Sequence, residues 1–390
     1  MVDGNSKQVF LPYDVVINIL IRLPVKSLIR FKCVSKDWFN LFQNTPNFFT
    51  QQHLNHSAHT NAFLLLQRIP RQPHSFPFST CLIGPDNNVV DRLEFADIAS
   101  PAAKIVASCN GILCLRDKTA LSLFNPATRQ IKQVHGTSLV GFHYVGFGFS
   151  PVANDYKIVK ISMCVFDEED QVVVLDDVRV DGAEVYSLTT GSWRQIDATK
   201  LRPLFLVSSS VTTTGTIFWL AIMPSDSGTD SECVVSFDIG REMFTLLNGP
   251  PLPPSTSRSY SNVLSVCNDK LAVFRHYIIG NFESCSFELW VLEDVHNHTS
   301  SKQRWIKMYS VGPFSRILYP LSIWRDEIVC REELFRHGND YRGVETVLSL
   351  FNPLSNELKK LPANRDEFCY LPFTYVESLV PVSHIHREQY

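Results

Sequence analysis

The chain of 390 residues lacks the features that mark a membrane or secreted protein. No apolar run approaches the roughly 18 residues that a transmembrane helix needs, because the early apolar stretch at residues 15–21 is followed by Arg22 and Pro24. The first residues, MVDGNSKQVFLP, contain no apolar segment ahead of a small-residue cleavage site. We therefore predict neither a secretory signal nor a membrane partner.

Strong charge and paired cysteines are missing as well. The 36 basic and 39 acidic residues leave a net charge of -3, which gives no general case for a nucleic-acid partner. The ten cysteines are scattered singly and form no CxxC pair, a pattern typical of reduced thiols. The expected location is the cytoplasm, and the nucleus as well.

Sequence motifs of catalytic, phosphate-binding and metal-binding sites are also lacking. GFGFSP, at residues 146–151, has neither the GxGxxG spacing nor the following helix of a phosphate-binding loop, and there is no GxSxG. His53, His56 and His59 are three residues apart, but no cysteine or carboxylate set completes a metal site. We predict no catalytic residue, no metal and no cofactor, and the chain is not expected to be an enzyme.

What the sequence does contain is an unusually apolar start. The β-branched residues of 15–21 would favour a strand, but Asn18 and Arg22 are four residues apart and form one polar stripe on a helix. Asp14 is placed to cap this helix, and Pro24 limits it to about residues 14–23.

Two more helices are expected. Pro24 opens the second, to about Cys33, and Ser35 caps the third, while residues 48–54 add a short turn. Because a domain of this size buries only about 60% of its surface, it cannot hide all its apolar residues. Apolar surface that remains on a soluble protein usually marks an interface. We therefore expect a partner to cover this module.

These residues resemble the F-box of plant F-box proteins. The match is LPYDVVINILIRLPVKSLIRFKCVSKDW, with its two Leu-Pro pairs, its Cys-Val-Ser-Lys and its Trp. The resemblance implies docking on a Skp1-like adaptor and, through Skp1, on cullin-1 of a ubiquitin ligase. The contact residues carried over are Leu11, Pro12, Ile19, Leu20, Pro24, Leu28, Val34 and Trp38.

The positive charge of this segment is complementary to an acidic partner. Five basic residues against two acidic ones give residues 14–45 a local net charge of +3. A helix-turn-helix DNA reader would present polar side chains from its last helix, whereas this third helix presents Trp38, Phe39, Leu41 and Phe42. We therefore predict no nucleic-acid partner. A plain N-terminal pair of core helices remains an alternative.

From residue 62 onward we predict short strands separated by turn residues. One unit recurs, as in LSLFNPATRQIKQV and LSLFNPLSNELKKL, with an aromatic residue before the turn. These aromatics are about 50–60 residues apart, near the kelch-type propeller period; they are Phe124, Tyr186, Phe237, Trp290 and Phe351. We predict about six blades, with residues 375–382 as closing strand beside residues 62–67; an open β-solenoid is the alternative.

This part resembles the F-box-associated domain of plants, which includes the S-locus F-box and S-locus F-box-like proteins. The resemblance covers residues 105–382 and rests on CNGILCL with FNPATR, on GFGFSPVANDYKIVK and on EVYSLTTGSWR. The predicted fold class is α+β multidomain, a small three-helix F-box followed by an all-β propeller-like domain. Its parts are a flexible N-terminus (1–10), the F-box (11–54), a connector (55–61), the β-propeller-like domain (62–382) and a tail (383–390).

Two segments are candidates for substrate recognition. Residues 167–182 carry seven acidic residues and one arginine, which is either a solvated loop or an acidic rim for a basic target. The resemblance suggests the S-RNases of pollen self-incompatibility as such targets. With a second loop at residues 331–343, the predicted substrate-binding residues are Asp167, Glu168, Glu169, Asp170, Asp176, Asp177, Phe335 and Tyr341.

The predicted function is that of the substrate-recognition subunit of an SCF (Skp1–cullin–F-box) ubiquitin ligase, with the β domain holding a protein target. Two alternatives stay open. One is a Skp1-binding interaction protein that joins no ligase, and the other is a glycan-binding F-box propeller.

Overall fold

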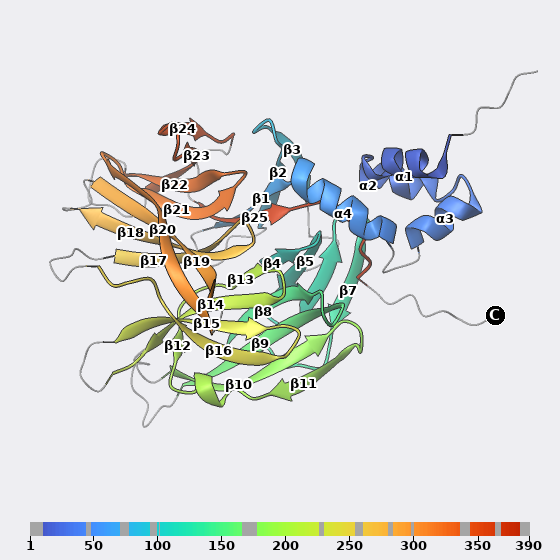
Figure 1. Ribbon diagram of the computed structural model, residues 1–390. Coiled ribbons are helices and arrows are strands. Elements are labelled where there is room, and N and C mark those ends of the chain that lie inside the picture. Colours follow the sequence, from blue (N-terminus) through green and yellow to red (C-terminus); the bar gives the residue numbers. More distant parts are fainter. Residues whose placement is uncertain are drawn as a thin grey trace, which may run out of the picture.

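A computed structural model shows four helices at one end of the molecule and six antiparallel sheets arranged around a ring (Figure 1). It describes residues 11–43, 48–70, 78–93, 100, 102–165, 178–225, 230–253, 260–279, 284–297, 300–335, 344–362 and 368–382.

The helical module begins two residues earlier than a cap at Asp14 would allow. Helix α1 starts after Pro12, which provides no side-chain cap, and Asp14 lies in the first turn, where a negative charge favours the helix N-terminus. The predicted cap at Ser35 is confirmed, because its Oγ accepts a hydrogen bond of 3.1 Å from the Trp38 N–H. The helices are α1 (Tyr13–Ile21), α2 (Val25–Phe31), α3 (Lys36–Gln43) and α4 (Phe48–Thr60).

Helix α4 corrects the prediction of a short turn followed by a connector. It continues through most of the residues assigned to the connector, up to Thr60, and the first strand begins three residues later, at Phe63. Its sequence is mostly polar, yet Phe49, His53 and Ser57 are buried at four-residue intervals. Packing of this face stabilises the helix where the composition alone suggests a loop.

Each sheet is one blade of a propeller. Within a blade the strands follow one another from an innermost strand at the centre of the ring to an outermost strand at its rim. The first three blades are made of β25 (Phe368–Tyr375), β1 (Phe63–Pro70), β2 (Ser79–Ile83) and β3 (Val89–Leu93); of β4 (Lys104–Cys109), β5 (Ile112–Arg116), β6 (Leu121–Asn125) and β7 (Gln130–Val134); and of β8 (Phe142–Ser150), β9 (Asp155–Val165), β10 (Val178–Ser187) and β11 (Ser192–Ile196).

The fourth blade has an extra short strand and is preceded by a 3-10 turn at Thr199–Leu201. Blades four to six are made of β12 (Phe205–Leu206), β13 (Val211–Thr213), β14 (Thr216–Met223), β15 (Ser231–Asp238) and β16 (Met243–Asn248); of β17 (Tyr260–Cys267), β18 (Lys270–Ile279), β19 (Ser284–Asn297) and β20 (Ser300–Phe314); and of β21 (Leu318–Trp324), β22 (Glu327–Phe335), β23 (Val344–Asn352) and β24 (Glu357–Lys360).

The ring closes between the two ends of the β domain. Strand β25 pairs antiparallel with β1, from Phe63 opposite Tyr375 to Pro70 opposite Phe368. The innermost strands contact one another in sequence, β4 with β8, β8 with β13, β13 with β17, β17 with β21, and β21 with β25, which returns to β4. The closing strand therefore precedes the predicted residues 375–382, which share only Tyr375 with it.

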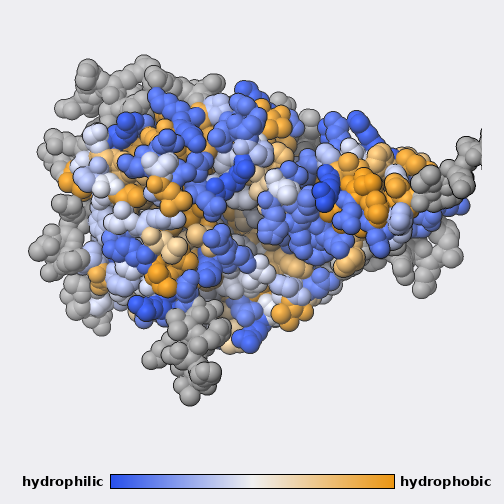
Figure 2. Space-filling model, turned by 45° about the horizontal axis from the view of Figure 1, so that its top comes forward, coloured by the Kyte–Doolittle hydropathy of each residue, from blue (hydrophilic) through white to orange (hydrophobic). Residues whose placement is uncertain are grey.

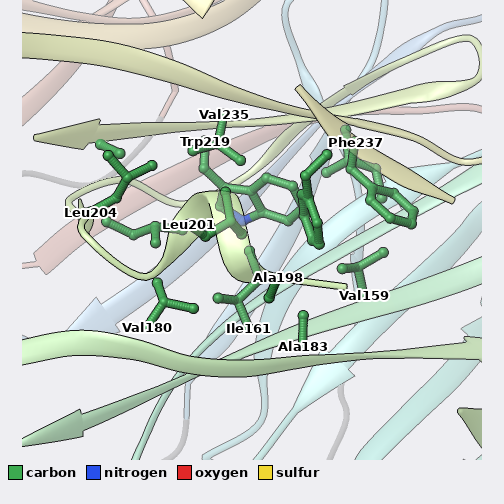
Figure 3. Close-up of a cluster of buried hydrophobic side chains, with 14 of the residues drawn as sticks. Val159, Ile161, Val180, Ala183, Ala198, Leu201, Leu204, Trp219, Val235 and Phe237 are labelled. Carbon is green, nitrogen blue, oxygen red and sulfur yellow. The ribbon is translucent and has the colours of Figure 1, made fainter. Parts of the chain in front are cut away.

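Neighbouring blades are held together by apolar side chains. Four of the five predicted repeat aromatics are buried, and all five lie on the third strand of their blades, on β6, β10, β15, β19 and β23. Figure 3 shows Trp219 and Phe237 of the fourth blade facing Val159 and Ile161 of the third. On β8, a Cβ added at Gly146 would lie 2.5 Å from the Trp219 ring, so glycine is needed for this close approach.

A chain that ends at Pro362 should lose the closing strand and with it the cooperativity of the ring. It leaves β1 as an unpaired edge and removes the buried side chains of Tyr370 and Tyr375. We expect the melting temperature to fall by about 10 °C or more, with aggregation on size-exclusion chromatography.

The matched control is a chain that ends at Tyr375 and keeps β25. It loses the buried Leu379 and Val382 but keeps the ring closed, so its propeller should melt as a monomer and at a higher temperature than the chain that ends at Pro362. If the chain that ends at Pro362 melted at the same temperature as this control, closure by β25 would be contradicted.

Candidate partner-binding surface

Apolar side chains remain exposed on the helical module. Val34 is 64% exposed and Ile19 is 47% exposed. Figure 2 shows a group of hydrophobic residues over the helical end of the molecule. The large apolar residues exposed there are Leu11, Tyr13, Val15, Ile19, Val34, Phe39 and Phe48.

The structure divides the eight predicted contact residues into three groups. Trp38 is half-buried, while Leu20 and Leu28 are buried, at 2% and 0% exposure. In this arrangement the last two lie beneath the surface, in the core of the helical module, and partner contact through them stays a prediction. Exposed are Leu11, Pro12, Ile19, Pro24 and Val34.

Four exposed apolar residues were absent from the predicted set: Tyr13, Val15, Phe39 and Phe48. Val15 had a signal in the sequence, because it lies four residues before Ile19 and shares its helix face. Phe39 follows Trp38, and which of two adjacent aromatics faces outward depends on the packing of α3 against α2 and α4.

Beneath this surface an aromatic row links three helices. The ring of Trp38 lies 5.1 Å from that of Phe31 and 6.5 Å from that of Phe42. Phe42 packs in turn on Phe49, at 5.1 Å between ring centroids. The row joins α2, α3 and α4, so the exposed residues stand on a packed base.

The helical module also exposes more basic than acidic groups. Arg22, Lys26, Arg30 and Lys36 are exposed. Lys32 is half-buried, and this burial lowers the pKa of its ammonium group. The module thus presents apolar contact area together with an excess of positive charge, which is complementary to an apolar surface with acidic surroundings.

His53 is the one buried ionisable residue of α4. Its side chain packs beside Phe49, and its Nε2 lies 2.9 Å from the carbonyl oxygen of Leu23, in the loop between α1 and α2. Burial lowers the pKa of the imidazole, against the opposing effect of the Leu23 hydrogen bond. A neutral His53 therefore ties α4 to the α1–α2 corner.

The candidate substrate residues of the propeller are outside what the structure describes. Asp167, Glu168, Glu169, Asp170, Asp176, Asp177 and Tyr341 lie outside the described residues, and for Phe335 only its backbone, at the end of β22, is described.

The strands that flank these segments end on one face. Asn110, in the β4–β5 turn beside the helical module, donates to the hydroxyl of Tyr156 near the start of β9. β9 therefore ends, and β10 begins, at the opposite edge of its blade, where Val165 pairs with Val178. In the sixth blade β22 likewise ends, and β23 begins, at this edge, where Phe335 pairs with Val344. The flanking strand ends thus lie on the face away from the helices.

In the described part of the chain, no three His, Cys, Asp or Glu side chains gather as a metal ion requires. The ten cysteines are unpaired, and burial raises the pKa of the Cys114 thiol to about 12, which keeps it protonated. None of the described helices is both long and apolar enough to cross a bilayer.

The geometry defines a class of protein, in which a short helical docking module is joined to a closed six-bladed propeller. Two family models match the chain, the F-box domain over residues 10–50 and the F-box associated beta propeller domain over residues 72–367. The second covers most of the chain, so the protein belongs to the F-box associated beta propeller family and carries an F-box before the propeller.

Relatives that are F-box proteins are found in Arabidopsis thaliana. F-box protein CPR1 is 25% identical over 322 residues, which cover 77% of this chain and 73% of the relative. F-box protein At4g19940 is 28% identical over 301 residues, covering 73% and 69%. Among solved structures, the periplasmic gluconolactonase PpgL of Pseudomonas aeruginosa matches 80% of this chain and 99% of its own at 11% identity, with a TM-score of 0.39, too low to bear on function.

The F-box should lose stability in mild acid through His53. Because the pKa of His53 in the folded chain lies below its ordinary value of 6.5, the unfolded chain binds the proton more readily as the pH falls through 6.5. The free energy of unfolding is thus not reduced by His53 above pH 6.5. Below this pH it falls by at most about 1.4 kcal/mol per pH unit for one group. Urea unfolding followed by helical ellipticity at pH 7.5 and 5.5 measures the change.

His53→Gln keeps an N–H donor and should remove this part of the pH dependence. His59→Gln, an exposed position on the same helix, is the matched control and should unfold like the native chain at both pH values. An unaltered pH dependence in His53→Gln would contradict the assignment.

Proposed function

We propose that this protein is the substrate-recognition subunit of an SCF ubiquitin ligase. Its F-box binds a Skp1-like adaptor and through it cullin-1, and its propeller holds a protein target. An F-box joined to a β-propeller implies such an adaptor. The observation that carries the proposal is the exposed apolar face of the F-box.

The energetics favour a covered face. Seven large apolar side chains are exposed on a module of about fifty residues. Burying an apolar residue of this size contributes about 1.5–3 kcal/mol. Leu11, Ile19 and Val34 belong to this face and match positions that the resemblance assigns to Skp1 contact. The net positive charge of the module favours the approach of an acidic adaptor.

The adaptor role needs no catalytic residue in this chain. A target held on the propeller is presented to a ubiquitin-loaded enzyme elsewhere in the complex, so its lysines experience a high effective concentration of that enzyme. The rate gain comes from proximity. F-box proteins are typically non-catalytic adaptors, and this function accounts for the protein without chemistry of its own.

We also propose that the protein works in the cytoplasm and the nucleus. Its ten cysteines are unpaired, and Cys33 is exposed on the F-box. A free exposed thiol beside a protein interface suits a reducing compartment.

Val34→Asp should abolish high-affinity binding to Skp1 without unfolding the chain. It places a charge at the centre of an interface while the native side chain is 64% exposed, so folding is little affected. Loss of a central contact costs about 2 kcal/mol or more, which is about a 30-fold weaker Kd. Isothermal calorimetry with purified Skp1 measures it. Leu20 is unsuitable for this test because it is buried.

Val152→Asp is the matched control, since Val152 is 93% exposed on the propeller. Equal Skp1 affinity of both variants would contradict docking through the F-box face. Affinity purification from cells tests the ligase itself, because cullin-1 should accompany the native chain and the Val152 variant but not Val34→Asp. Skp1 without cullin-1 would favour the alternative of an interaction protein outside the ligase.

We propose further that the target is a basic protein, with the S-RNases as the first candidates. Two features support this: the acidic composition of residues 167–182, and flanking strand ends that lie on the face away from the F-box. A glycan-binding role is the competing idea, and a glycan array distinguishes the two.

Reversal of Asp167, Glu168, Glu169 and Asp170 to lysine should weaken capture of an S-RNase. Opposite charges attract a basic target most strongly at low salt, so the difference between native and reversed chain should shrink as ionic strength rises. Surface plasmon resonance at two salt concentrations measures it. Equal affinity of the native and the reversed chain at both salt concentrations would contradict the acidic rim.

A further inference from the structure

Seven residues after the closing strand lie between the F-box and the propeller and bond to both. These residues, 376–382, are named here the C-terminal strap. They follow Tyr375, the last residue of β25, without forming a strand of their own. Ser378, Leu379 and Val382 of the strap are buried.

On its F-box side the strap completes the helical core. Leu379 is 5% exposed and belongs to the same apolar cluster as Leu20, Val25 and Phe42. The cluster also includes Ala127, from the β6–β7 turn of the propeller. The F-box thus takes two of its packing partners from the β domain, one of them more than three hundred residues away in sequence.

A hydrogen bond supplements this packing. Helix α2 is preceded by Pro24, which has no side chain able to cap the free N–H groups of the first turn. The Val25 N–H donates instead to Oε2 of Glu377, at 3.2 Å. A carboxylate at a helix N-terminus also interacts favourably with the helix dipole. The strap therefore provides the cap that α2 lacks.

On its propeller side the strap is held by Asn125, a fully buried residue at the end of β6. The Asn125 amide donates to the carbonyl oxygens of Ser378, at 3.0 Å, and Val380, at 2.7 Å. Val382 then enters the apolar core of the second and third blades. Gly111 leaves room for the strap, because a Cβ there would lie 2.4 Å from that of Ser378.

We propose that the strap is a clamp that fixes the F-box on the propeller in one orientation, with Asn125 and Leu379 as positioning residues. The only covalent link from F-box to propeller is the short passage from α4 to β1, about which a module could swing. A second attachment removes that freedom. Resting on the proposed function, the clamp sets a constant distance between the target on the propeller and the ligase bound to the F-box.

Single-molecule energy transfer in the full chain tests the clamp. Dyes attached through unnatural amino acids at Asn40 on the F-box and Thr190 on the propeller, both exposed, report the orientation. The native chain should give one narrow distribution of transfer efficiency. Leu379→Asp should replace it by a broad one, whereas Leu354→Asp, at an 83% exposed leucine, should leave it narrow.

Asn125→Ala provides a variant that changes no side chain of the F-box core. The repeat offers its control, since Asn352 accepts the same turn hydrogen bonds in LSLFNP of the sixth blade but does not touch the strap. Asn125→Ala should broaden the distribution and Asn352→Ala should not. Narrow distributions in both Leu379→Asp and Asn125→Ala would overturn the clamp.

Skp1 binding separates this inference from the proposed function, because the dyes report orientation with or without Skp1. Failure of the native chain to bind Skp1 would remove the ligase role but not the clamp. Native Skp1 affinity of Asn125→Ala together with a broad distribution is the expected pair of results. Native affinity with a narrow distribution would count against the clamp alone.

Discussion

The pairing of β25 with β1 is the constraint on which the rest of this molecule depends. A ring of sheets without that pairing would leave two unsatisfied edges, and the six blades would not share one continuous set of inter-blade cores. The pairing also decides where the chain ends arrive. Tyr375 lies opposite Phe63, three residues beyond the end of α4. The chain that leaves the ring is therefore delivered to the base of the F-box, and residues 376–382 contact both modules as a consequence of closure.

The apolar excess of the F-box is shared between this chain and a partner. Part of it is covered by α4, by Leu379 and by Ala127, all from outside the predicted three helices. What remains exposed, with Val34 and Ile19 among its members, is what the chain itself does not cover. Hence the apolar composition alone overstated how much surface a partner must shield, while the face that remains is still large enough for an interface.

Local patterns explain which parts of the fold were predictable. The first three helices and the blade repeat depend on nearby residues, such as Ser35 capping α3 and the aromatics of the third strands, and the structure confirms them. Helix α4 was missed because its buried face contains His53 and Ser57, which read as polar. Residues 376–382 were taken for a strand because they are apolar, but their carbonyl groups bond to Asn125, about 250 residues earlier, and no local pattern reveals that. The burial of Leu20 and Leu28 is likewise not visible in a local pattern, since they pack against Phe49 of α4 and Leu379 of the strap.

The arrangement separates the two tasks of an adaptor in space. The turn at Gly111, which adjoins the strap, joins first to second strand, and the turn at Ala127, which packs in the F-box core, joins third to fourth; both lie on one face of the ring. The ends of β9, β10, β22 and β23 that flank the candidate recognition segments lie on the other. Each blade is anchored by its own inter-blade core, so a sequence change between a second and a third strand need not disturb the seat of the F-box. A propeller of this kind can therefore change its target while the distance to the ligase stays constant, which is what catalysis by proximity requires.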